Sequence, residues 1–148
     1  MAKSYASTVI DAPADEVWTR IRDFDHLPVW HGGMVATSEI EEGKAGDQVG
    51  CVRSFTLVND DHIREQLLSH SDADRSYSYA FRKHPFTGVE NYVSTIRVTP
   101  VTDGDKSFVE WWTTFDCPAD KLDHWQKFFA TQVFQGGLDA LKAHFSEK

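Results

Sequence analysis

Residues 34–115 consist of short runs in which polar and apolar residues alternate, and a turn signal containing Gly, Asn or Asp follows each run. Alternation with a period of two is typical of half-buried β-strands. Every connection is of hairpin length, which excludes parallel crossovers and predicts an antiparallel meander. We predict six strands in it, at about residues 35–41, 48–58, 62–70, 76–82, 90–99 and 107–115.

The segments on either side of the meander predict one more strand and three helices. Residues 3–11 alternate like a strand, and Pro13 then precedes apolar residues at helical spacing. Residues 28–31 predict a second short helix, which ends before Gly32 and Gly33. After Pro118, apolar residues recur near helical spacing over about 27 residues, which corresponds to a helix of about 40 Å. These apolar residues are Leu122, Trp125, Phe129, Val133, Leu138, Leu141 and Phe145.

Together these elements predict a single α+β domain over residues 1–148. A seven-stranded curved antiparallel sheet would surround the long C-terminal helix, with two short helices after the first strand. One domain is the usual count for 148 residues, and a domain of this size buries roughly 70% of the surface that its unfolded chain exposes. The chain is therefore long enough to form a substantial core.

The charge of the chain restricts its partners. It carries 15 Lys and Arg residues against 23 Asp and Glu residues, a formal net charge of -8, and has no basic cluster. Such a chain repels phosphate backbones, so we expect no nucleic-acid partner. No apolar run is long enough for a signal peptide or a membrane span, so we expect a cytoplasmic protein with no membrane partner.

Cysteine and histidine usage gives no sign of a metal site. Cys51 and Cys117 form neither a zinc set nor a disulfide framework; two free thiols are the favoured interpretation, and one bridge is the alternative. The histidines show no metal-binding spacing, so we predict no metal. The chain has no phosphate-binding glycine loop, dinucleotide fingerprint or nucleophile elbow, which argues against hydrolase, nucleotide-binding and dehydrogenase functions. We predict no cofactor.

The order of strand, two short helices, six-stranded meander and long helix resembles the helix-grip fold of the START-like superfamily, also called SRPBCC. Within it, the chain is most similar to the polyketide cyclase/dehydrase and lipid-transport branch. The resemblance implies a ligand pocket between the sheet and the C-terminal helix. Four fragments carry it: Val49-Gly50-Cys51-Val52-Arg53-Ser54-Phe55, Arg64-Glu65-Gln66-Leu67, Tyr77-Ser78-Tyr79 with Glu90-Asn91-Tyr92, and Val109-Glu110-Trp111 leading to Phe115-Asp116-Cys117-Pro118.

Strand alternation predicts which side chains face that pocket, because residues two apart share one side of a strand. A three-residue turn at residues 58–60 would place Arg53 directly opposite Glu65, where cross-strand side chains lie about 5 Å apart. The same alternation predicts a concave face that includes Phe55, Tyr77, Tyr79, Tyr92, Ser94, Val109, Trp111, Thr113 and Phe115.

Glu65 is the most informative of the predicted pocket residues. A carboxylate among aromatic side chains is costly to bury unless it is paired, and Arg53 is its expected partner. One interpretation is an ion pair with a purely structural role. The other is that Glu65, with Tyr79 and Tyr92, anchors or protonates a polar group of the ligand; in an enzyme these three would be the catalytic residues.

Gly136 and Gly137 are unusual in a helix interior, where each costs roughly 1 kcal/mol relative to alanine. They indicate close packing or a kink, or else room left for a ligand. The resemblance adds pocket residues from the helices and loops. The complete predicted ligand-binding set is Trp30, His31, Arg53, Phe55, Glu65, Tyr77, Tyr79, Phe86, Tyr92, Ser94, Trp111, Thr113, Phe129, Val133 and Gly137.

Three functions are compatible with this pattern. The leading one is a binding protein, monomeric or homodimeric, for a small apolar or aromatic molecule. The second is a cofactor-independent cyclase, dehydratase or lyase in which Glu65 and a tyrosine provide acid/base catalysis. The third is an interaction protein similar to chaperone activators, for which an exposed apolar patch near Trp112 would be the sign.

Overall fold

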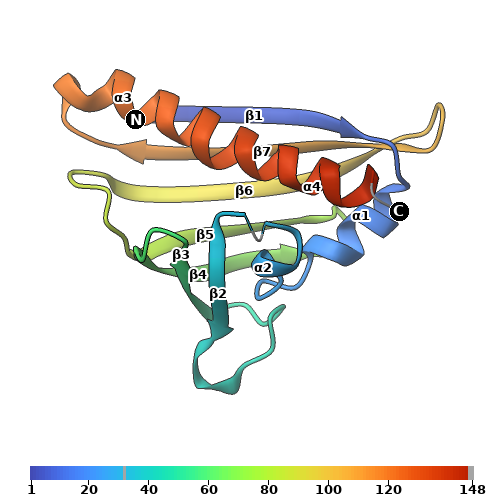
Figure 1. Ribbon diagram of the computed structural model, residues 1–148, viewed down its shortest axis with the longest axis horizontal. Coiled ribbons are helices and arrows are strands. Elements are labelled where there is room, and N and C mark those ends of the chain that lie inside the picture. Colours follow the sequence, from blue (N-terminus) through green and yellow to red (C-terminus); the bar gives the residue numbers. More distant parts are fainter. Residues whose placement is uncertain (32, 147–148) are drawn as a thin grey trace.

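The structure is a computed structural model that describes residues 1–31 and 33–146; Gly32, at the predicted end of the second helix, lies outside the described residues. Its strands form one antiparallel sheet in the order β1-β7-β6-β5-β4-β3-β2 (Figure 1). The strands are β1 (Ala2–Ile10), β2 (Val35–Ile40), β3 (Val52–Leu57), β4 (His62–Ser71), β5 (Ser76–Lys83), β6 (Glu90–Val101) and β7 (Lys106–Asp116). The predicted α+β helix-grip fold is confirmed.

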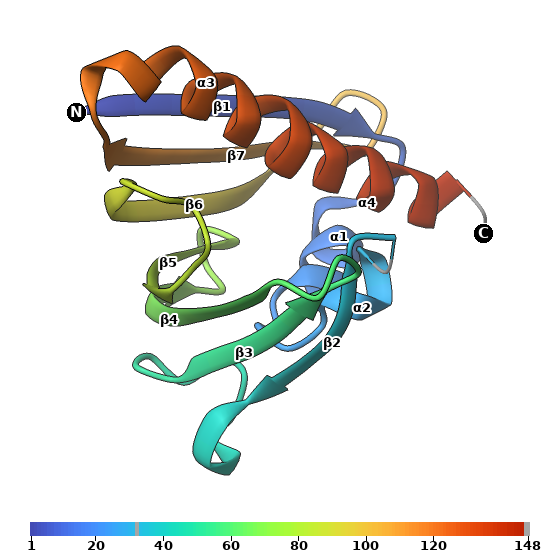
Figure 2. The same ribbon diagram turned by 60° about the vertical axis from the view of Figure 1, so that its left-hand side comes forward.

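The helices lie on the concave side of the curved sheet and at one of its ends. They are α1 (Ala14–Ile21), α2 (Leu27–Trp30), α3 (Leu122–Lys127) and α4 (Gly136–Ser146), with 3-10 turns at Glu41–Gly43 and Ala119–Lys121. Figure 2 shows the C-terminal helical segment running along β1 and β7 while the sheet curves away toward β2. No helix within residues 1–31 and 33–146 is long and apolar enough to cross a membrane.

The short helix α1 closes one end of the sheet because one of its faces is apolar. Val17 and Ile21 are fully buried, and Phe24, just after the helix, is fully buried as well. Trp18 is buried too, and its indole N–H donates a 2.8 Å hydrogen bond to Asp72 in the turn between β4 and β5. Hydrophobic burial and this hydrogen bond together hold α1 against the sheet.

The hairpin of β3 and β4 has the predicted register, with Arg53 paired to Glu65. Asp60, in the three-residue turn, adopts a positive φ of 73°, which is typical of the last residue in such turns. The predicted start of β3 at residue 48 is wrong by four residues. Cys51 N–H instead donates to the Gln48 carbonyl in a tight turn, and Gly50 there has a φ of 96° that favours glycine.

The sequence predicted one regular helix at the C-terminus. In the structure this helix is interrupted by a π-helical stretch at Phe128–Gln135. A π-helix bonds residue i to i+5, so it accommodates apolar residues spaced five apart. Phe129, Phe134 and Leu138 are all fully buried at spacings of five and then four. The irregular apolar spacing in the sequence is therefore matched by a local change of helix type rather than by a break.

Candidate functional site

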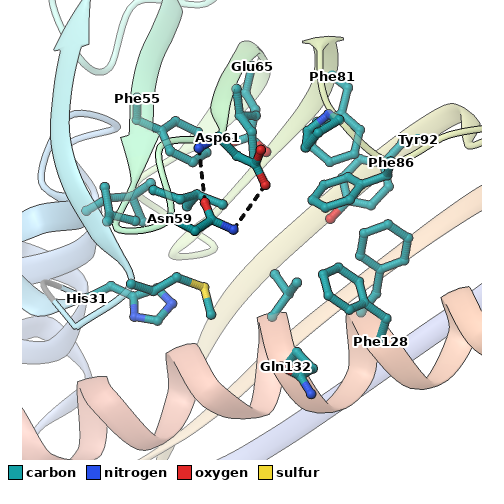
Figure 3. Close-up of a pocket in the computed structure, with 18 of the residues that line it drawn as sticks. His31, Phe55, Asn59, Asp61, Glu65, Phe81, Phe86, Tyr92, Phe128 and Gln132 are labelled. Atoms are coloured by element: carbon teal, nitrogen blue, oxygen red, sulfur yellow. Dashed lines mark hydrogen bonds between the residues drawn. The ribbon is translucent and has the colours of Figure 1, made fainter.

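A cavity of about 420 Å³, here called the central cavity, lies between the concave face of the sheet and the C-terminal helical segment. Nine of its described lining residues are Phe, Tyr or Trp, and eight more are aliphatic residues, Met or Pro, so its walls are mainly apolar and rich in aromatic rings. Figure 3 shows Phe81, Phe86, Tyr92 and Phe128 gathered on one side of it and His31 on the other. The lining side chains come from α2, β2 to β7, the hairpin turns and the C-terminal segment, so distant parts of the chain assemble it.

Ten of the fifteen predicted ligand-binding residues line this cavity. Strand alternation accounts for the residues on β3 to β7, because it correctly identified which alternate side chains of each strand point to the concave side of the sheet. Phe86 lines the cavity from the loop between β5 and β6. The ten are His31, Arg53, Phe55, Glu65, Tyr79, Phe86, Tyr92, Trp111, Phe129 and Val133.

Three of the other predicted residues are buried in the packed core beside the cavity. Trp30 stacks on the His31 ring at 5.5 Å between ring centroids, and Tyr77 packs edge-on against Phe24 at 5.6 Å. Gly137 lies against the Trp111 ring, because a Cβ atom built on it would be 2.5 Å from that ring. Of the alternatives for this glycine, the structure thus supports close packing of helix on sheet rather than space for a ligand.

The remaining two predicted residues are polar side chains that bond to the sheet backbone. The Ser94 hydroxyl donates a 2.9 Å hydrogen bond to the Trp112 carbonyl. The Thr113 hydroxyl donates one of the same length to the Val93 carbonyl. Both are fully buried, and neither lines the central cavity. Alternation identified their side of the sheet correctly but does not show that these short side chains end below the cavity surface.

Arg53 and Glu65 form a buried ion pair in the cavity wall. The Glu65 Oε1 atom accepts a 2.8 Å hydrogen bond from Arg53 Nε and lies 2.7 Å from Arg53 Nη2. The guanidinium also donates to the Phe24 carbonyl at 3.1 Å and lies 3.8 Å from the centroid of the Phe24 ring. Only 2% of the Arg53 side chain and 5% of the Glu65 side chain are exposed, so each charge depends on the other.

Two opposing effects act on the acidity of Glu65. Burial raises the pKa of this carboxyl above its ordinary value, and the Arg53 guanidinium opposes the rise. Arginine stays protonated in proteins, so a neutral Glu65 would leave a buried cation without its partner. The short contacts between the two side chains are those of an ionised pair. Glu65 is therefore a charged acceptor in a mainly apolar cavity.

The predicted pocket tyrosines occupy different surroundings. The Trp111 indole N–H donates a 3.1 Å hydrogen bond to the Tyr79 hydroxyl, and both residues are buried. The Tyr92 ring stacks on Phe81 at 3.9 Å between centroids and 13° between planes. Burial raises the pKa of both tyrosines above the usual value, so their hydroxyls remain protonated at neutral pH.

His31 is a buried, uncharged member of the cavity wall. It is 6% exposed, and burial together with the nearby Arg53 charge lowers its pKa to about 4. Its Nδ1 atom is buried and has no hydrogen-bond partner within the described part of the chain. At neutral pH this ring therefore contributes a neutral polar group.

The mouth of the cavity carries residues that the sequence interpretation missed. Asn59 and Asp61 lie there, and the Asn59 amide N–H donates to Asp61 at 3.1 Å (Figure 3). Gln132 and Phe128 face the mouth from the π-helical stretch, where helical periodicity does not predict the direction of a side chain. Phe81 could have been predicted from the sequence, because alternation places it on the same side of β5 as Tyr77 and Tyr79.

Other side chains that the sequence singled out do not form a second site. Cys51 is buried, Cys117 is half-buried, and both are free thiols. No group of three or more metal-ligating side chains occurs within residues 1–31 and 33–146. Trp112 is half-buried, and the Arg97 guanidinium covers its ring at 5.7 Å from the centroid.

Comparison with known proteins agrees with this geometry. An uncharacterized protein of Bacillus thuringiensis is 32% identical, with 98% of this chain and 99% of that chain covered and a TM-score of 0.85. A protein of Nitrosospira multiformis is 27% identical, with 99% of each chain covered and a TM-score of 0.84. A comparison with curated proteins gave no match.

A more distant structure shares the fold. Norcoclaurine synthase from Thalictrum flavum, in complex with dopamine and hydroxybenzaldehyde, is 20% identical with a TM-score of 0.78, covering 98% of this chain and 86% of that one. The family model described as polyketide cyclase / dehydrase and lipid transport matches residues 1–146. With this match over nearly its whole length, the chain belongs to the polyketide cyclase/dehydrase and lipid transport family.

Proposed function

We propose that the protein binds a small apolar or aromatic molecule in the central cavity. The observation that carries this proposal is the cavity itself, about 420 Å³ with mainly apolar walls that are rich in aromatic rings. Its described charged lining groups are Arg53, Glu65 and, at the mouth, Asp61. Sites for small molecules are typically cavities of roughly 300–1,000 Å³ lined in this way. The complex of norcoclaurine synthase with two aromatic molecules supports the proposal by analogy of fold.

The first test is native mass spectrometry of the protein as purified, followed by titration with the neutral fluorophore N-phenyl-1-naphthylamine. A matched pair of variants locates the binding. Val133 lines the cavity, whereas Thr131 is exposed and does not line it. We expect Val133→Trp to occupy part of the cavity and weaken binding, and Thr131→Trp to leave binding unchanged. Equal binding by both variants would place the fluorophore elsewhere and contradict the proposal.

Acid/base catalysis by Glu65 is the second candidate, and one observation favours it. Burial raises the pKa of Glu65, which is the direction that a general acid or base near neutral pH requires. The ion pair with Arg53 opposes proton exchange, so binding ranks first. If Glu65→Gln still bound a candidate substrate but no longer converted it, catalysis would be favoured. Equal turnover by the wild-type protein and Glu65→Gln would exclude Glu65 as the catalyst.

A further inference from the structure

Among the described residues, the hydrogen bonds to Glu65 end on only one of its two carboxylate oxygens. Both short contacts from Arg53, at 2.8 Å and 2.7 Å, end on Oε1. No hydrogen bond within residues 1–31 and 33–146 ends on Oε2. The side chain extends from β4 toward the central cavity, whose wall it forms (Figure 3). Oε2 is accessible from the cavity rather than enclosed by protein. A ligand that displaces water there must supply a donor or leave a charged oxygen unpaired, which is costly.

The cavity offers no corresponding site for an anionic group. Arg53 is the only Arg or Lys among the described lining residues, and its guanidinium is engaged by Glu65, by the Phe24 carbonyl and by the Phe24 ring. His31 is uncharged at neutral pH. At the mouth the charged lining group is another carboxylate, that of Asp61. A ligand carboxylate would meet two acidic side chains and no unpaired cation.

We propose that the ligand is a neutral aromatic or apolar molecule carrying a hydroxyl or N–H group, which donates a hydrogen bond to Glu65 Oε2. The same arrangement selects against carboxylates. This inference rests on the proposed function and specifies its ligand class. The Arg53 contacts hold Oε1, so Glu65 is oriented before the ligand arrives. A hydrogen bond to an ionised group in a dry site is among the stronger polar contacts.

The preference for ligands that carry a donor follows from the cost of leaving the Glu65 carboxylate unpaired when a ligand fills the cavity. A ligand without a donor fills the same space but leaves Oε2 desolvated and unpaired, which weakens its binding. A ligand with a carboxylate adds a second buried anion close to Glu65, which weakens binding further. Polar matching therefore decides between molecules of almost equal shape, for which the aromatic walls provide little discrimination.

Four probes with one ring system test the inference by calorimetric titration near neutral pH: naphthalene, 2-naphthol, 2-methoxynaphthalene and 2-naphthoate. We expect 2-naphthol to bind about tenfold or more tightly than 2-methoxynaphthalene, which has the same oxygen but no proton to donate. We expect 2-naphthoate to bind more weakly than naphthalene.

Two variants assign the effect to Glu65. Glu65→Gln keeps an acceptor but removes the charge, so the preference for 2-naphthol over 2-methoxynaphthalene should fall to about threefold or less, and 2-naphthoate should gain affinity. If that single variant is poorly folded, the double variant Arg53→Met with Glu65→Leu replaces the pair by apolar side chains of similar size. It should bind 2-naphthol and 2-methoxynaphthalene equally.

The outcomes separate this inference from the proposed function. If the wild-type protein binds naphthalene, 2-naphthol and 2-methoxynaphthalene equally, or binds 2-naphthoate most tightly, the donor-selective assignment is wrong while the binding function stands. A preference for 2-naphthol that persists in the double variant also overturns the role of Glu65. If none of the four probes binds, the proposed function fails, and the inference fails with it.

Discussion

Arg53 and Glu65 face each other across β3 and β4, with Arg53 Nη2 2.7 Å from Glu65 Oε1 and the guanidinium 3.8 Å from the centre of the Phe24 ring. The pair is thus held on one side by the sheet register and on the other by the residue that follows α1. This leaves the Glu65 carboxylate in a defined orientation at the cavity wall. The polar chemistry of the cavity depends on this orientation.

Removing one member of this pair should destabilise the protein much more than removing both. In Arg53→Met the buried Glu65 charge loses its partner, and we expect the free energy of unfolding to fall by roughly 3–5 kcal/mol. In the double variant Arg53→Met with Glu65→Leu no charge remains, and we expect a change of about 1 kcal/mol or less. Urea unfolding of the three proteins measures this. Equal losses in the single and double variants would show that the pair is not energetically coupled.

The two adjacent glycines of α4 should respond in opposite directions to alanine. A Cβ atom on Gly137 would lie 2.5 Å from the Trp111 ring, so Gly137→Ala should cost roughly 1–3 kcal/mol through overpacking. A Cβ atom on Gly136 meets only the Thr131 carbonyl at 3.7 Å, so Gly136→Ala should stabilise the helix by up to about 1 kcal/mol. Thermal and urea unfolding compare the two; a stabilising Gly137→Ala would contradict the observed packing.

His31 should make the stability depend on pH on the acidic side of neutrality. Its pKa is about 4 in the folded protein and 6.5 ordinarily, so between these values the unfolded chain binds a proton that the folded one excludes. The contribution of His31 to the free energy of unfolding is fully present above about pH 6.5, and it declines by roughly 3 kcal/mol as the pH falls to about 4. We expect His31→Gln to lose this part of the pH dependence when urea unfolding is measured at about pH 7 and about pH 5.

The control for His31 is an exposed histidine. His124 is exposed on α3, so His124→Gln should retain the dependence of the wild-type protein. If His31→Gln kept the same slope of unfolding free energy against pH as the wild type, another group would be responsible for it.

The hydrogen bond between Trp111 and Tyr79 should contribute measurably to stability. Tyr79→Phe leaves the buried indole N–H of Trp111 without its acceptor, which should cost about 1–3 kcal/mol. Tyr5 provides the matched control, because its hydroxyl donates a 2.8 Å hydrogen bond to Glu110 on the exposed face of the sheet. Tyr5→Phe should change the free energy of unfolding by about 0.5 kcal/mol or less. Similar losses in both variants would contradict the buried contribution.

The sequence predicted the antiparallel meander and the facing of its strands, because alternation has a period of exactly two in a sheet that is buried on one face. It also predicted that Arg53 faces Glu65, since one short turn determines the register of the whole hairpin. The helix-grip arrangement was implied by the resemblance of this order of elements to the START-like superfamily, and the structure confirms it.

Tertiary packing decided the rest. Alternation identifies the buried side of a strand but not how deep a side chain ends, which is why Ser94 and Thr113 bond to the backbone below the cavity. Phe128 and Gln132 line the cavity from the π-helical stretch, where α-helical periodicity does not predict the direction of a side chain. Which carboxylate oxygen of Glu65 is approached by Arg53 is likewise a matter of tertiary packing. The guanidinium that contacts Oε1 also packs on the ring of Phe24, a residue far away in the sequence.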